Sequence, residues 1–172
     1  MIEAFYEGYG PGGIAILLET LTDNKNRTSS AIRSTFTKSG GNMAESGSVM
    51  WQFSQKGIVI VDAQDDLAEE MALTAIDAGA DDFETYDSTL EIFASPSNLE
   101  EVRRALTGIS AEIRSSELAM IPQNTIMLDS KTAKQTLRLM DLLEDLDDVQ
   151  KVYSNADFPD DALAEYGSET QQ

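Results

Sequence analysis

The chain has 172 residues, of which 41% are hydrophobic and 25% are charged, a composition typical of a folded globular protein. It contains no histidine and no cysteine, which excludes disulfides, thiolate metal sites and nucleophiles that depend on a histidine base. Its formal charge of -19 opposes binding to phosphate backbones and anionic membranes unless the twelve basic residues are concentrated in one place.

The first third of the chain predicts strands that surround one helix. Three segments have the apolar and β-branched content of strands: 3–6, 14–21 and 49–53. Asp23 is the predicted N-cap of a helix that continues to about Lys38, and Gly40 and Gly41 end this helix. We expect these elements to belong to an α+β domain.

A second set of elements begins at residue 56. Four segments predict strands: 57–61, 83–86, 90–93 and part of 111–120. Two segments, 67–78 and 99–106, have apolar residues at helical spacing. The order strand, helix, strand, strand, helix, strand is the ferredoxin-like plan. We therefore predict a ferredoxin-like domain over residues 56–122.

We expect the last part of the chain to belong to the same domain as the first third. Residues 125–128 and 149–153 predict strands, and residues 130–146 predict a helix with a buried leucine stripe. The simplest topology joins 1–55 and 123–158 into one discontinuous α+β domain, with 56–122 inserted into it. Residues 159–172 have little to bury, and we expect a flexible tail there.

The basic residues are unevenly distributed. Residues 1–55 hold four bases and five acids, whereas 56–122 have a net charge of -11 and 123–172 have a net charge of -7. The helix in the first third has no acid after its cap, and its arginines and hydroxyls can bond to phosphate oxygens. The predicted nucleic-acid contacts are Lys25, Asn26, Arg27, Arg33, Ser34 and Lys38. The alternative is an ordinary solvated helix face.

A glycine-rich loop lies between the first two predicted strands. Its members are Tyr9, Gly10, Pro11, Gly12 and Gly13. A dinucleotide-binding loop needs its glycines between a strand and a helix, but a strand follows here. We therefore interpret the loop as a strand connection that requires positive φ or close backbone approach, and we expect it to lie beside the nucleic-acid contacts.

Other classes of site are not predicted. The acidic groups at 62–70 and 141–148 lack the spacing of a calcium-binding loop and are interpreted as solvated helix faces. We predict no catalytic residue, no metal site and no cofactor, and therefore no enzyme. No apolar run approaches the ~18 residues of a membrane span, and no secretory signal is present, so we expect a cytoplasmic protein without membrane contact.

Several blocks of the sequence together resemble the YebC/PmpR family, in the order found in that family. They are EGYGPGG at 7–13, TDNKNRT at 22–28, KSGGN at 38–42, GSV at 47–49, AGADD at 78–82, IPQNT at 121–125 and DVQKVYSNAD at 148–157. The resemblance implies an α+β middle domain with an inserted ferredoxin-like domain. It also implies a preceding basic helical domain, and because this chain starts just before the first block, we expect that domain to be absent from it.

The resemblance further implies a non-enzymatic regulator of gene expression. Bacterial relatives are described as DNA-binding transcriptional regulators, which is the function expected first. The alternative is a ribosome-associated translational activator that meets rRNA or tRNA. Either partner would then require the basic helical domain for full affinity. A further alternative is an acidic interaction module, in which the inserted domain binds a protein partner.

Overall fold

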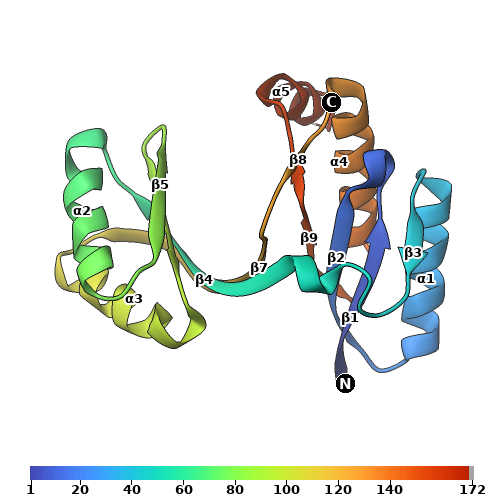
Figure 1. Ribbon diagram of the computed structural model, residues 1–172, viewed down its shortest axis with the longest axis horizontal. Coiled ribbons are helices and arrows are strands. Elements are labelled where there is room, and N and C mark those ends of the chain that lie inside the picture. The colour runs from blue at the N-terminus through green and yellow to red at the C-terminus, as the bar shows by residue number, and fades with distance from the viewer. Residues whose placement is uncertain (171–172) are drawn as a thin grey trace. The chain divides into compact units, whose positions relative to one another are not determined.

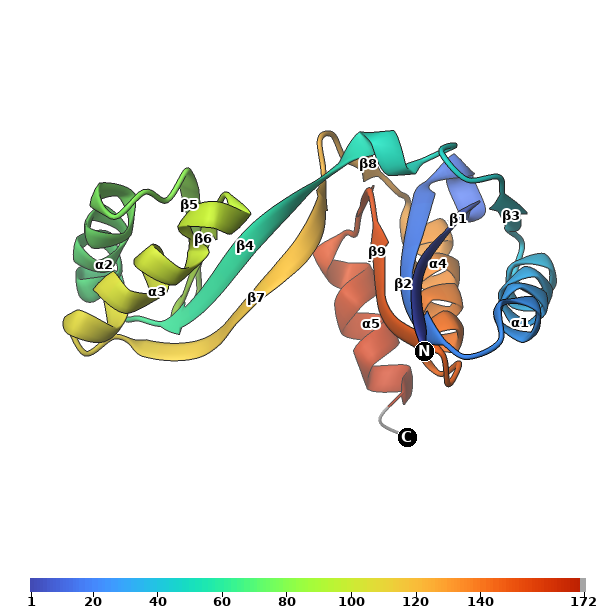
Figure 2. The same cartoon turned by 90° about the horizontal axis from the view of Figure 1, so that it is seen from below.

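The computed structural model describes residues 1–170, except for the side chains of Asp65 and Thr170, and divides the chain into two compact units. Unit 1 comprises Met1–Phe53 and Pro122–Gln172, and unit 2 comprises Ser54–Ile121. The chain leaves unit 1 through β4 and returns through β7, which are neighbouring strands of one sheet (Figure 2). The α+β fold class predicted from the sequence is confirmed (Figure 1).

Unit 1 is built on a four-stranded antiparallel sheet in the order β3-β1-β2-β9. Its strands are β1 (Ile2–Tyr9), β2 (Ala15–Thr22), β3 (Asn42–Ala44) and β9 (Val149–Ser154). Its helices are α1 (Lys25–Lys38), α4 (Ser130–Glu144) and α5 (Asp160–Thr170). Two short strands, β8 (Ile126–Met127) and β10 (Ala156–Asp157), form a separate parallel pair, and 3-10 turns lie at Pro11–Gly13 and Met50–Gln52.

The core of unit 1 lies between one face of this sheet and the helices α1 and α4. Ile16 and Leu18 of β2 contribute to it, together with Phe36 of α1 and Leu139 and Leu143 of α4, and all five side chains are fully buried. Burying a side chain of this size typically contributes about 1.5–3 kcal/mol, so this packing fixes the positions of α1 and α4.

A buried carboxylate holds the segment that follows β3. Glu7 of β1 is only 2% exposed. Its carboxylate accepts hydrogen bonds from the backbone N–H groups of Gly47 at 2.6 Å, Val49 at 2.8 Å and Met50 at 2.7 Å. These three charge-assisted bonds satisfy the carboxylate without a cation and fasten residues 47–50 to the sheet.

Unit 2 has the ferredoxin-like order of elements. They are β4 (Phe53–Asp62), α2 (Asp65–Asp77), β5 (Asp82–Tyr86), β6 (Thr89–Ala94), α3 (Leu99–Gly108) and β7 (Glu112–Pro122), with a 3-10 turn at Pro96–Asn98. The sheet order is β5-β6-β4-β7. Val59, Leu90 and Ile92 of the sheet are buried with Val102 and Leu106 of α3. The helices α2 and α3 therefore cover one face of this sheet.

Two local expectations in unit 1 are wrong. The N-cap of α1 is Asn24, whose side chain accepts a hydrogen bond from the Arg27 N–H at 3.1 Å, rather than Asp23. Residues 50–52 form a 3-10 turn, and the strand starts only at Phe53. The backbone N–H groups of Val49 and Met50 donate to the Glu7 side chain and not to a neighbouring strand, so this segment does not join the sheet. Strand propensity does not include such a side-chain contact.

The expected flexible tail at 159–172 is also different in the structure. Residues 160–170 form α5, and Ala162 of this helix is fully buried in the core of unit 1. The helix also places carboxylates beside lysine and arginine side chains of α4, a tertiary contact that a short polar sequence does not reveal. Residues 171 and 172 of the expected tail lie outside the described residues.

Candidate nucleic-acid interface

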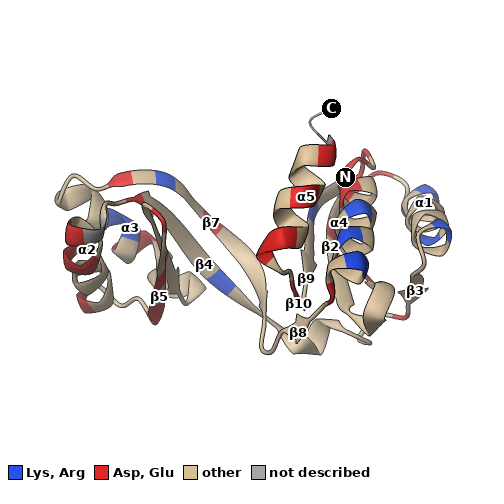
Figure 3. Ribbon diagram, turned by 90° about the horizontal axis from the view of Figure 1, so that it is seen from above, with Lys and Arg blue, Asp and Glu red and all other residues tan. Residues whose placement is uncertain are grey.

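The basic residues of unit 1 are concentrated on two helices. Eight of the twelve bases belong to unit 1, and seven of these eight lie on α1 or α4. Figure 3 shows them as blue bands along both helices. No Asp or Glu occurs within α1, and the first acid of α4 is Asp141. In a chain with a net charge of -19, these two helices therefore carry most of the positive charge of unit 1.

A groove of about 480 Å³ separates the end of α1 from α4. We call it the α1–α4 groove; it is lined by Pro11, Lys38, Ser39, Gly40, Gln135, Arg138 and Leu142. Lys38 comes from the last turn of α1, and Arg138 comes from the middle of α4. The groove thus places two cations from separate helices around one hollow, beside the glycine loop.

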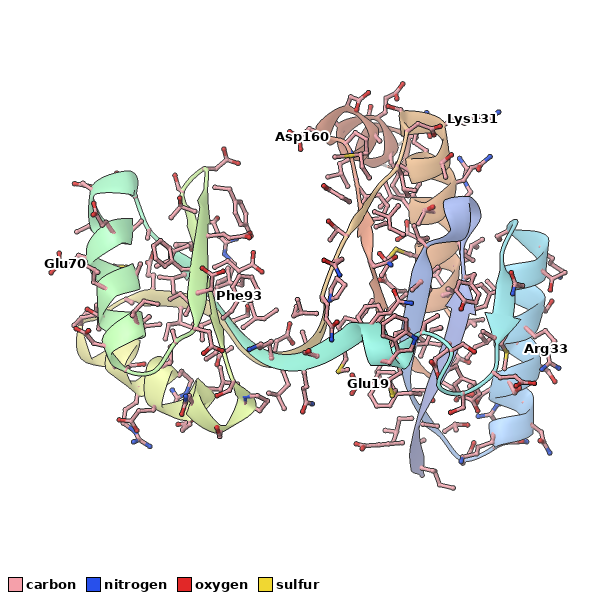
Figure 4. The ribbon with its side chains drawn as sticks, viewed as in Figure 1. Glu19, Arg33, Glu70, Phe93, Lys131 and Asp160 are labelled. Carbon is pink, nitrogen blue, oxygen red and sulfur yellow. The ribbon has the colours of Figure 1, made fainter. Side chains whose placement is uncertain are left out.

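A second hollow of about 420 Å³ follows α4 and shares two lining residues, Gln135 and Arg138, with the α1–α4 groove. It is also lined by Ser130, Lys131, Lys134 and Glu165. Figure 4 shows Lys131 near the start of α4. The two hollows make one longer surface along this helix.

The basic face of α4 consists of Lys131, Lys134 and Arg138. At 100° per residue, their spacing places all three within an arc of about 60°. Leu139 and Leu143 of the same helix are buried in the core. The leucine stripe was predicted from the sequence but this basic face was not, although the three- and four-residue spacing of its bases indicates one face of a helix.

The glycine loop brings α1 and α4 together by close backbone approach. Gly12 and Gly13 both have φ of 76°, a left-handed conformation that glycine adopts without strain. A Cβ atom on Gly12 would lie 3.0 Å from a methyl group of Leu128, just before α4. A Cβ atom on Gly41, just after α1, would overlap the carbonyl oxygen of Tyr9. Larger residues at these two positions would therefore require Leu128 or the backbone of Tyr9 to move.

The predicted contacts on α1 are dispersed over the helix. Lys38 lines the α1–α4 groove, whereas Arg33, labelled on α1 in Figure 4, lines a different hollow together with Tyr6 and Met43. Arg27 lies eleven residues before Lys38, a distance of about 16 Å along the helix axis. The remaining predicted contacts are exposed positions of α1: Lys25, Asn26 and Ser34.

Arg27 has an intramolecular partner. Its guanidinium group donates to Asp148, with Nη2 2.9 Å and 3.1 Å from the two carboxylate oxygens, and to Asp23 at 2.8 Å. The Thr28 hydroxyl donates to Asp148 as well, at 2.6 Å. This cluster ties the start of α1 to the residue before β9. These bonds give Arg27 a part in the stability of unit 1, and its contact with nucleic acid stays a prediction.

The Asp148 cluster makes stability dependent on pH. The hydrogen bond from Thr28, and then those from Arg27, lower the pKa of Asp148 below its ordinary value of 3.8. The charged carboxylate therefore stabilises unit 1 above pH 4, and this contribution is lost as the pH falls through the lowered pKa.

We expect Asp148→Asn to reduce the free energy of unfolding at pH 7 and to flatten its decline below pH 4. Urea unfolding at pH 7, 5, 4 and 3 measures both effects. The exposed Asp147→Asn, one position earlier, makes the same change in charge and is the control. If the free energy of unfolding declined equally with falling pH in Asp148→Asn and in the unchanged chain, the stabilising role of the charged Asp148 would be contradicted.

Membrane-spanning helices and groups of metal ligands are both absent from residues 1–170. No helix in this range combines the length and the hydropathy that a membrane crossing requires. Within the same range, no three acidic side chains are grouped as ligands of a metal ion.

The sequence matches known proteins over nearly its whole length. The profile described as the TACO1/YebC second and third domain matches residues 1–156. A probable transcriptional regulatory protein of Halothermothrix orenii is 49% identical over 167 residues, which cover 95% of this chain and 66% of that protein. A probable transcriptional regulatory protein of Chloroflexus aurantiacus is 49% identical over 166 residues, which also cover 95% of this chain and 66% of that protein. This chain thus spans about two thirds of the length of these curated relatives.

A solved structure supports the same relationship. The crystal structure of the conserved hypothetical protein Aq1575 from Aquifex aeolicus aligns with a TM-score of 0.83 and 38% sequence identity. The alignment covers 92% of this chain and 66% of that chain.

Proposed function

Because the chain belongs to the TACO1/YebC family, we propose that it is a non-enzymatic regulator of gene expression that contacts nucleic-acid phosphates through the α1–α4 groove. One observation carries the proposal: Lys38 and Arg138 line the same groove in a chain with 31 acids. The names of the relatives, probable transcriptional regulatory proteins, favour DNA as the partner.

The chemistry of the groove fits a phosphate backbone. The Arg138 guanidinium can donate two parallel hydrogen bonds to one phosphate, whereas Lys38 acts as a compact point charge. The Gln135 side chain, which also lines the groove, can bond to a phosphate or sugar oxygen. Such contacts fix the position of a protein on a duplex but carry no base sequence directly, so we expect binding with little sequence preference from this surface.

The same chemistry suits the ribosome, whose rRNA also presents phosphates. To distinguish the two partners, the labelled chain is titrated with purified ribosomes at 0.15 M salt in the presence and absence of excess duplex DNA. Displacement of the chain by duplex DNA supports transcriptional regulation. Retention on ribosomes despite the DNA supports a translation factor. Absence of binding to both would contradict a phosphate-binding role for this chain.

We propose a second candidate function for unit 2, as a docking domain for a basic protein. On the face of its sheet away from α2 and α3, Glu84 of β5 lies directly opposite Glu91 of β6. Ile60 of β4 is in register with Glu91 on the other side, and Ile58 is paired with Phe93. Burial, and then the charge of Glu84, raise the pKa of Glu91. A basic side chain would relieve this repulsion while covering the apolar residues.

Glu84→Gln with Glu91→Gln tests this second function. Because the repulsion between the two carboxylates is removed, we expect unit 2 to become more stable while its affinity for an arginine-rich peptide falls several-fold. Urea unfolding and a fluorescence titration measure the two effects. Glu69→Gln with Glu70→Gln on α2 changes the net charge equally and is the matched control. Equal loss of peptide affinity in both double variants would show an effect of net charge alone.

A further inference from the structure

The basic face of α4 is partly neutralised by α5. The Lys134 ammonium lies 3.0 Å from a Glu169 carboxylate oxygen and 3.6 Å from one of Glu165. The Arg138 guanidinium lies 4.0 Å from Glu169. In Figure 3 the red bands of α5 stand next to the blue bands of α4. Two of the three cations on this face therefore already have carboxylate partners.

The two other cations at this surface differ from Lys134 and Arg138 in their ion pairing. Within residues 1–170, neither Lys38 nor Lys131 has a carboxylate within ion-pair distance. The acids Glu165 and Glu169 of α5 thus meet the part of the surface that runs from Lys134 to Arg138, and Asp161 of α5 accepts a hydrogen bond from the Ser130 hydroxyl at 2.7 Å. A phosphate backbone that extends from the α1–α4 groove along α4 would encounter Glu165 and Glu169 there.

The contacts that hold α5 are mostly polar. Ala162 is its single fully buried apolar side chain among the described residues, and Leu163 is 45% exposed. The Tyr166 hydroxyl donates to Asp141, and burial together with this bond raises the pKa of Tyr166 to about 12. Exposed ion pairs contribute little to stability. A helix with so little buried apolar surface can separate from unit 1 at a lower free-energy cost than α1 or α4.

We propose that α5 is an acidic latch, in which Glu165 and Glu169 occupy Lys134 and Arg138 in the place of nucleic-acid phosphates. Carboxylates and phosphates compete for the same donors, so a phosphate must displace the carboxylates before it binds along α4. The latch rests on the proposed function, because it regulates the same surface. It makes the affinity of the chain for nucleic acid depend on whether α5 is docked.

The test is a fluorescence anisotropy titration of a labelled 20-bp duplex with Glu165→Gln and Glu169→Gln combined. Two freed cations are expected to tighten binding about tenfold at 0.1 M salt. The matched control combines Glu3→Gln with Glu45→Gln, two exposed acids of unit 1 that give the same change in net charge. Far-UV circular dichroism establishes that both double variants remain folded. Tightening confined to the α5 variant supports the latch.

Other outcomes contradict the latch in distinguishable ways. Equal tightening in the two double variants would overturn it, because net charge alone would explain the effect. Binding that is lost on charge reversal of Lys38 and Arg138 but unchanged by the α5 substitutions would overturn the latch and leave the proposed function intact. Absence of binding by the unchanged chain and by every variant would overturn both. Binding that only the α5 variant shows would support both.

Discussion

Charge reversal in the α1–α4 groove, Lys38→Glu combined with Arg138→Glu, is expected to weaken binding to duplex DNA by tenfold or more, an order-of-magnitude estimate for two lost phosphate contacts at 0.1 M salt. Both side chains line the groove, and in the variant they would repel the phosphates. Fluorescence anisotropy with a labelled duplex measures the loss. Neither side chain belongs to the buried core, so we expect the variant to remain folded.

The control for this prediction reverses two other charges on α1. Lys25→Glu with Arg33→Glu produces the same change in net charge, at exposed positions that do not line the groove. We expect this variant to lose much less affinity. If both double variants lost affinity equally, binding would depend on the charge of the whole chain, and the groove would have no special part in it.

Replacing Glu7 with alanine is expected to lower the free energy of unfolding by about 3 kcal/mol or more, because three backbone N–H groups lose their acceptor. Each buried donor left without a partner typically costs about 1–3 kcal/mol. Residues 47–50 would also detach from the sheet, so their amide hydrogens should exchange faster. Urea unfolding and hydrogen exchange measure the two effects.

Glu3→Ala, on the same strand, is the control for the Glu7 prediction. Glu3 is exposed, and we expect its replacement to change the free energy of unfolding by no more than about 0.5 kcal/mol. A small effect of Glu7→Ala, equal to that of Glu3→Ala, would mean that water satisfies the N–H groups of residues 47–50.

The order of elements could be predicted because local patterns determine it. The strand and helix order of unit 2 follows from apolar periodicity, and the observed sheet order β5-β6-β4-β7 is that of the ferredoxin-like plan. The family could be identified from short blocks such as residues 7–13, and the comparisons confirm it. The place of α5 depended instead on tertiary contacts of Ala162 and on ion pairs to α4.

The candidate interface was only partly predictable for the same reason. The basic character of α1 is visible in the sequence, and Lys38 does line a groove. The partner of Lys38 in that groove is Arg138, one hundred residues away, and no local pattern connects the two. Arg27 was predicted as a contact from its helix face, but it is paired with Asp148, which lies 121 residues away and which no local pattern connects to it. Long-range pairing therefore decides which bases remain available to a ligand.

The salt dependence of duplex binding reports how many phosphates the α1–α4 groove contacts. The observed association constant of the unchanged chain and of the Lys38→Glu and Arg138→Glu double variant is measured between 0.05 M and 0.2 M salt. Loss of two phosphate contacts is expected to reduce the slope of log K against log salt by about 1.8 in the variant. The same slope for both proteins, or binding that does not depend on salt, would contradict phosphate recognition by the α1–α4 groove.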